Sequence, residues 1–170
     1  VFFLAASAGL MVLSQAASMV TAYGASTPAA LLATTAITGA IAAARVAGGS
    51  LIDRLPVPIV AAAAQGAALL GAVALTALPS PGMAILALGL IGVGYGLISG
   101  VTAGAVASYW PKAEFGRIAS RTYIAWCLAA ICLPVLAGRL YDLTGSYETA
   151  VIVAGGANLL AVLVALTLPR

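Results

Sequence analysis

Apolar residues run almost without interruption along this chain, in stretches each close to the ~20 residues that a helix needs to cross a bilayer. Short breaks with proline, glycine, charged or aromatic residues separate six such stretches, as chain reversals at a membrane surface do. The six stretches cover residues 3–22, 28–52, 57–78, 83–108, 118–141 and 148–168. They are too long for barrel strands and lack a two-residue alternation. The pattern therefore predicts an all-α membrane protein with six transmembrane helices.

The composition agrees with lipid as the medium around the chain. Of its 170 residues, 64% are hydrophobic and 6% are charged, whereas a soluble domain carries about 25% charged residues. We therefore predict a multi-pass integral membrane protein of the cell (inner or plasma) membrane, with the lipid bilayer as a partner. The net charge of +3 bears on orientation and does not indicate nucleic-acid binding.

The distribution of basic residues predicts which side of the membrane is cytoplasmic. The second and fourth breaks and the C-terminus fall on one side, which carries Arg54, Lys112, Arg117, Arg121 and Arg170. The opposite side carries only Arg139. Because cytoplasmic loops are enriched in lysine and arginine, the first side is predicted to face the cytoplasm.

The six helices also divide into two groups of three. Because three is an odd number, the second group enters the membrane from the opposite face, which predicts a 3+3 inverted repeat. Polar residues share one face in the first, second, fourth and fifth helices. In the first helix this face carries Ser7, Ser14, Ser18 and Thr21. They are sparse in the third and sixth, with Gln65, Thr76 and Asn158. We therefore expect four helices to line a watery cleft and two to face lipid.

The residues needed for catalysis are missing from the predicted membrane core. There is no histidine, which excludes an H-E-x-x-H zinc site and a serine–histidine pair. The four acidic residues all fall at predicted surfaces, so no general acid or base remains inside the membrane. Cys127 and Cys132 lack a partner cluster and are interpreted as small core residues. We predict that the protein is not an enzyme and has no catalytic residue, cofactor or metal.

Four glycines recur every fourth residue of the fourth stretch, namely Gly92, Gly96, Gly100 and Gly104. Glycine on one face of a membrane helix lets another backbone approach closely. We interpret this glycine stripe as a helix-packing surface in preference to a ligand contact.

The motif "GGSLIDRLP", residues 48–56, resembles the G-x-x-x-D-R core of the loop signature of major facilitator superfamily transporters. Gly49, Asp53 and Arg54 match it, whereas Pro56 and Val57 stand where the family has a glycine and a basic pair. Residues 115–147 are similar to the eleventh helix of that family and the loop after it. The resemblance implies that residues 1–170 are the C-terminal half, helices seven to twelve, of a twelve-helix transporter. The chain would then be a fragment whose partner is the absent N-terminal half.

The resemblance also suggests a role for the charges in this motif. Gly49, Asp53 and Arg54 are interpreted as a cytoplasmic latch. Asp53 would pair with Arg117 or Arg121, or cap a helix of the absent half, in one transport state and release in the other. Ordinary loop charge is the alternative interpretation.

Arg45 lies inside the second apolar stretch, where a charge costs about 2.5–3.5 kcal/mol and is usually tolerated for function. A narrower resemblance is to monocarboxylate porters and oxalate/formate antiporters, which carry an arginine in the eighth helix four residues before a glycine. Arg45 and Gly49 match that spacing. Ile41 stands where proton-coupled members often have an aspartate, and no basic residue matches the eleventh-helix lysine of the oxalate carriers.

These features together predict a secondary active transporter, a symporter or antiporter, that moves a small organic anion such as a monocarboxylate by alternating access. Arg45 would bind the carboxylate, because a guanidinium suits it bidentately. Candidates for the cavity wall are Thr38, Tyr95, Ser99, Tyr123 and Trp126. Two alternatives stay open: a carrier of a neutral or drug-like solute in which Arg45 is structural, and a non-transporting receptor or assembly module.

Overall fold

The computed structural model describes residues 2–78 and 80–169, apart from the side chain of Ser7. Arg170, one of the basic residues used to predict the orientation, lies outside the described residues. The side chain of Ser7, part of the predicted polar face of the first helix, also lies outside them. The described residues form seven α-helices and one 3-10 turn. These are α1 (Phe2–Leu13), α2 (Ala16–Ala22), α3 (Thr27–Leu51), α4 (Val57–Ala77), α5 (Pro81–Tyr109), η1 (Lys112–Glu114), α6 (Phe115–Thr144) and α7 (Glu148–Leu166). The predicted all-α membrane fold is confirmed.

Local sequence explains where these helices begin and end. Proline stands in the first turn of α3, α4 and α5, where its missing N–H is not needed by the helix. The Ser80 hydroxyl caps α5 by accepting a hydrogen bond from the backbone N–H of Met83 at 3.2 Å. Gly145 ends α6 with a left-handed φ of 69°, a conformation that glycine adopts without a Cβ penalty. The breaks that were read from the sequence therefore coincide with the turns.

The first predicted helix, over residues 3–22, is not continuous. The chain breaks at Ser14 and Gln15, and α1 and α2 meet at an angle of 51°. The Gln15 N–H bonds to the carbonyl of Val12, three residues back, at 3.1 Å, which tightens the turn and redirects the chain. By length and composition, five of the helices can each cross a membrane, and α1 with α2 can make a sixth, broken span.

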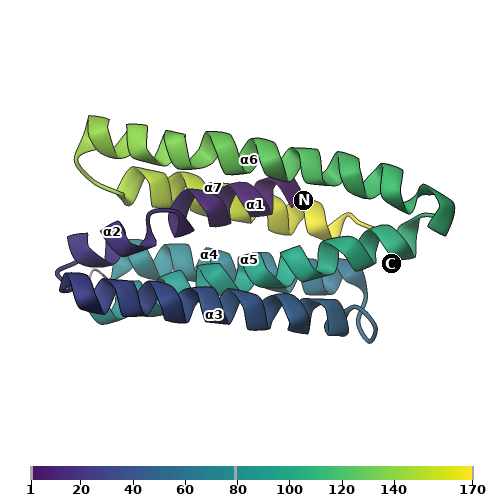
Figure 1. Ribbon diagram of the computed structural model, residues 1–170, viewed down its shortest axis with the longest axis horizontal. Coiled ribbons are helices and arrows are strands. Elements are labelled where there is room, and N and C mark those ends of the chain that lie inside the picture. The colour runs from purple at the N-terminus through teal and green to yellow at the C-terminus, as the bar shows by residue number, and fades with distance from the viewer. Residues whose placement is uncertain (1, 79, 170) are drawn as a thin grey trace.

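Helices of the first group of three pack against helices of the second group (Figure 1). Helix α3, the middle helix of the first group, packs mainly on α5, and α6, the middle helix of the second group, packs mainly on α1. The last helices, α4 and α7, pack against each other, and so do α1 and α5. This reciprocal arrangement is what an inverted repeat requires. Helices α1, α4, α5 and α7 therefore form the centre, flanked by α3 and α6.

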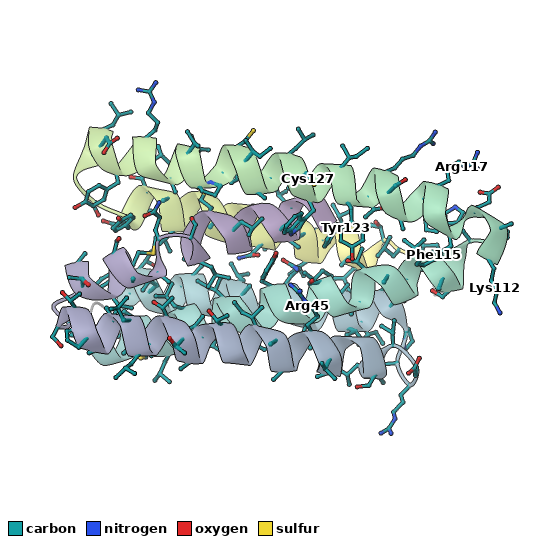
Figure 2. All side chains as sticks on the ribbon, viewed as in Figure 1. Arg45, Lys112, Phe115, Arg117, Tyr123 and Cys127 are labelled. Carbon is teal, nitrogen blue, oxygen red and sulfur yellow. The ribbon has the colours of Figure 1, made fainter. Side chains whose placement is uncertain are left out.

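The two flanking helices are the least covered. Among the 30 residues of α6, only the small side chains of Ala129 and Ala137 are buried. Helix α3 likewise buries Ala30, Ala33, Ile37, Ala44 and Gly48, and its remaining surface is open or partly open. The loops that carry Arg54 and Lys112 lie at one end of the bundle, which we call the basic end (Figures 1 and 2).

Candidate functional site

The glycine stripe of α5 lies against α3. A Cβ atom at Gly92 would lie 3.1 Å from Cγ1 of Ile41, and one at Gly96 would lie 2.9 Å from Cβ of Ala44. At Gly100 an added Cβ would collide with the backbone carbonyl of Arg45, and at Gly104 with the side chain of Ile52. Any larger residue in the stripe would push the two helices apart.

The close contact between α3 and α5 therefore fixes the backbone position of Arg45. Its carbonyl packs against Gly100, and the neighbouring side chain of Ala44 is buried against α5. The Arg45 side chain is exposed and forms no hydrogen bond or ion pair with the other described residues. It lies six residues before Leu51, the last residue of α3, which corresponds to about 9 Å at 1.5 Å per residue. A charged group thus lies on a rigid helix within an apolar span.

Tyr95 and Trp126 form a direct link between α5 and α6. The indole Nε1–H of Trp126 donates a hydrogen bond to the hydroxyl of Tyr95 at 2.8 Å. The Tyr95 ring lies over Gly9 of α1, where a Cβ would come within 2.8 Å of Cδ2 of the ring. Only 7% of Tyr95 is exposed, and Trp126 and Ile41 pack against the same cluster. In this conformation Tyr95 therefore lies behind Trp126 and not on an open wall.

The helix register places three of the predicted residues in a layer about one helical turn closer to the basic end than Tyr95 and Trp126. These residues are Arg45, Ser99 and Tyr123. Arg45 follows Ile41 by one turn on α3, and Ser99 follows Tyr95 by one turn on α5. Tyr123 precedes Trp126 by about one turn on α6, which runs in the opposite direction. Figure 2 shows Arg45 and Tyr123 in the central part of the long axis.

The remaining predicted wall residues differ in exposure. Tyr123 is 41% exposed and meets the ring of Phe2 edge-on, with centroids 5.8 Å apart. Ser99 is partly buried. Thr38 is exposed two turns from Arg45, and its hydroxyl donates to the carbonyl of Thr34 at 2.8 Å. Thr38 therefore keeps only acceptor capacity for a ligand.

The predicted latch residues lie at the basic end. Asp53 lines a hollow of about 510 Å³ together with Ser108 and Tyr109. Arg117 binds Glu114 through an ion pair of 2.8 Å, so its guanidinium is engaged within its own turn and not with Asp53. Arg54 is exposed, and Gly49 is partly exposed with no atom within 4 Å of an added Cβ. The backbone nitrogen of Gly49 nevertheless borders α5, since a Cβ at Gly100 would lie 3.0 Å from it, and the preceding Gly48 faces the backbone of Leu97.

A second hollow, of about 300 Å³, lies at the opposite end of the bundle. Its lining includes Tyr141 and Tyr147, whose rings stack with centroids 4.3 Å apart, and Glu148. Burial and then the negative charge of Glu148 raise the pKa of Tyr23. Its hydroxyl stays protonated and donates to the carbonyl of Leu75 at 3.2 Å, which ties the end of α2 to α4.

Three contacts in this region were missed from the sequence: Gly9 under Tyr95, Gly48 against α5, and Ile41 beside Trp126. Gly48 had a visible signal, because it is paired with Gly49 in the motif. No sequence signal distinguished Gly9 or Ile41, since small and apolar residues occur throughout the chain.

Comparison with known proteins gives one family match. The family model described as Major Facilitator Superfamily matches residues 1–170, which is the whole of the chain. No curated protein matches it.

Proposed function

The chain belongs to the Major Facilitator Superfamily, whose members are secondary transmembrane transporters and not enzymes, and from this premise we propose that it moves a small organic anion. The observation that carries the proposal is the exposed guanidinium of Arg45 within an apolar helix. Because no other described residue neutralises it, a bound anion would supply the missing charge. A monocarboxylate is the class that we favour, since a guanidinium donates two parallel hydrogen bonds to a carboxylate.

The surroundings of Arg45 support a binding role over a purely structural one. The α3–α5 contact at Gly100 fixes the backbone of Arg45, so the side chain projects from a fixed Cα position. The exposed ring of Tyr123, which packs edge-on against the buried ring of Phe2, presents aromatic surface in the layer that the helix register assigns to Arg45. We propose that Ser99, Tyr123 and Trp126 form the wall of the site, that Tyr95 supports Trp126 from behind, and that Thr38 accepts hydrogen bonds nearer the opposite end.

We further propose that residues 1–170 are one half of a transporter and that the other half covers α3 and α6. The exposed apolar side chains of these two helices, Leu31, Leu32, Val46, Ile124, Leu128 and Ile131, are open on the described bundle. Arg45 and Tyr123 lie on the same two helices. A second six-helix unit placed there would enclose the site and allow rocking between two open states.

Uptake in liposomes tests this function. The full-length protein is reconstituted, loaded with unlabelled substrate, and assayed for counterflow of labelled lactate, formate or oxalate, with an uncharged analogue in parallel. We expect exchange of at least one monocarboxylate and none of the uncharged analogue. Exchange of the uncharged compound without competition by anions would favour a neutral or drug-like solute. A protein that exchanges nothing and is stabilised by none of these compounds would be a receptor or assembly module.

A further inference from the structure

Two amide side chains lie buried where the bundle is otherwise apolar, and we propose that they bind internal water between α4 and α7. Gln65 belongs to α4 and Asn158 to α7, and each is only 1% exposed. In the sequence both were rare polar residues of helices that were expected to face lipid, and neither was assigned a function. Their burial shows that they point into the bundle instead.

Three of the four polar atoms of these amides are buried without a protein partner. Gln65 Oε1, Asn158 Oδ1 and Asn158 Nδ2 are buried, and none has a hydrogen bond to an atom of the described residues. A buried amide without a partner loses its hydration and gains nothing in return, so such groups are rare in native proteins. Buried water that makes two to four hydrogen bonds is the usual partner when protein groups are out of reach.

Packing around the two amides locates the site between two contact points. At one, the Cβ that Gly155 lacks would lie 3.4 Å from Cβ of Ala72, so α7 and α4 touch there. At the other, Ala165 of α7 joins Ala61 and Ala64 of α4 in one cluster. Gln65 and Asn158 fall between these points along their helices. Measured from the Gly155–Ala72 contact, Asn158 lies three residues along α7 and Gln65 seven residues along α4, so the two amides lie about one helical turn apart within the α4–α7 contact.

The site is also deep in the bundle. Gln65 comes eight residues after Val57, where α4 begins, and Asn158 comes eight residues before Leu166, where α7 ends. Both of these helix termini lie at the basic end (Figure 1), so each amide lies about 12 Å along its helix from that end. Alanines of α1 belong to the clusters on either side, Ala5 to one and Ala8 to the other. Small side chains of α1 thus border the part of the α4–α7 contact that holds the amides.

Water suits this site better than an ion. The three atoms are two acceptor oxygens and one nitrogen that carries two N–H donors, and a water molecule both donates and accepts. A cation would be repelled by the Nδ2 donor, and no carboxylate lies in α4 or in α7 beyond its first residue, Glu148.

Nuclear magnetic resonance of the full chain in nanodiscs tests the proposal directly. Asn158 is the only asparagine among these 170 residues, and Gln65 is one of two glutamines, so these residues contribute very few signals to a spectrum with selective ¹⁵N labelling of side-chain amides. Gln65→Leu identifies the Gln65 signal by its loss. Gln15, which is partly exposed at the α1–α2 break, is the matched control for an amide open to solvent.

We expect Overhauser cross-peaks between water and the side-chain amide protons of both Asn158 and Gln65, with the sign of long-lived bound water, while the Gln15 amide exchanges rapidly with solvent. Visible amide signals without these cross-peaks would overturn the proposal. A structure that resolves ordered water provides an independent check. Density is expected roughly 2.7–3.2 Å from the three atoms, and a direct Gln65–Asn158 bond with no such density would refute the water site.

Discussion

The indole N–H of Trp126 donates a hydrogen bond of 2.8 Å to the hydroxyl of Tyr95, and this bond joins α6 to α5 across α1. Few other contacts connect α5 with α6, because Gly9 of α1 lies beneath the Tyr95 ring and α1 packs between the two helices. The bond therefore holds a flanking helix, α6, in its place beside the central helices.

Removing this bond should loosen α6. We expect Trp126→Phe, which keeps an aromatic ring, to reduce the free energy of unfolding by about 1 kcal/mol. That reduction corresponds to a thermal midpoint lower by about 2–4 °C for a chain of this size. Tyr95→Phe removes the same bond from the other side. The double variant should be no less stable than either single variant. Fully additive losses in a thermal melt would show that the two side chains act independently.

The contact between α5 and α3 predicts which glycines tolerate a methyl group. Gly100→Ala and Gly96→Ala should each cost about 1–3 kcal/mol, since the new Cβ overlaps the backbone of α3. Gly89→Ala on the same helix is the control, because nothing lies within 4 Å of its added Cβ. The control should stay within about 0.5 kcal/mol of wild type. Equal midpoints for all three variants in detergent melts would mean that α5 does not pack on α3.

Replacing Arg45 should weaken anion recognition strongly and leave the protein folded. Charge-assisted hydrogen bonds contribute about 1.5–3 kcal/mol, so Arg45→Ala should weaken anion binding roughly 10- to 100-fold. Arg45→Lys should recover little, because an ammonium lacks the bidentate fork. Arg139→Ala, an exposed arginine of α6 near its other end, is the control and should bind normally. Binding is measured from the stabilisation of the full-length protein by lactate or formate. Normal binding by Arg45→Ala would make Arg45 a packing or snorkelling residue.

The predicted orientation can be tested with single cysteines in a background that lacks Cys127 and Cys132, both of which are exposed. A cysteine at Ala113, in η1 at the basic end, should react only from the cytoplasmic side. Ser146, in the α6–α7 turn, should react from outside. Gly145 is unsuitable, because its φ of 69° would strain a cysteine. Both cysteines reacting with an impermeant maleimide from one side of intact cells would contradict an arrangement of six spans.

The helix ends were largely predictable, because their signals are local. Pro81 after Ser80, Gly145 after Thr144, and the charges at Asp53 and Arg54 mark turns without reference to the rest of the fold. The length of each apolar run then implies a membrane span. The break at Ser14 and Gln15 was missed, since apolar sequence continues on both sides of it.

Six apolar runs were enough to predict a helical membrane bundle, with an arginine on a polar face and a glycine stripe suited to close packing. The packed helices were needed to show that the stripe meets α3 at Arg45, that Tyr95 is covered by Trp126, and that Gln65 and Asn158 point inward. The difference arises because lipid is as apolar as a protein interior. In water, hydrophobicity separates the buried face of a helix from its exposed face. In a membrane both faces are apolar, so the partner of each face is selected by the fit of side chains from helices distant in sequence.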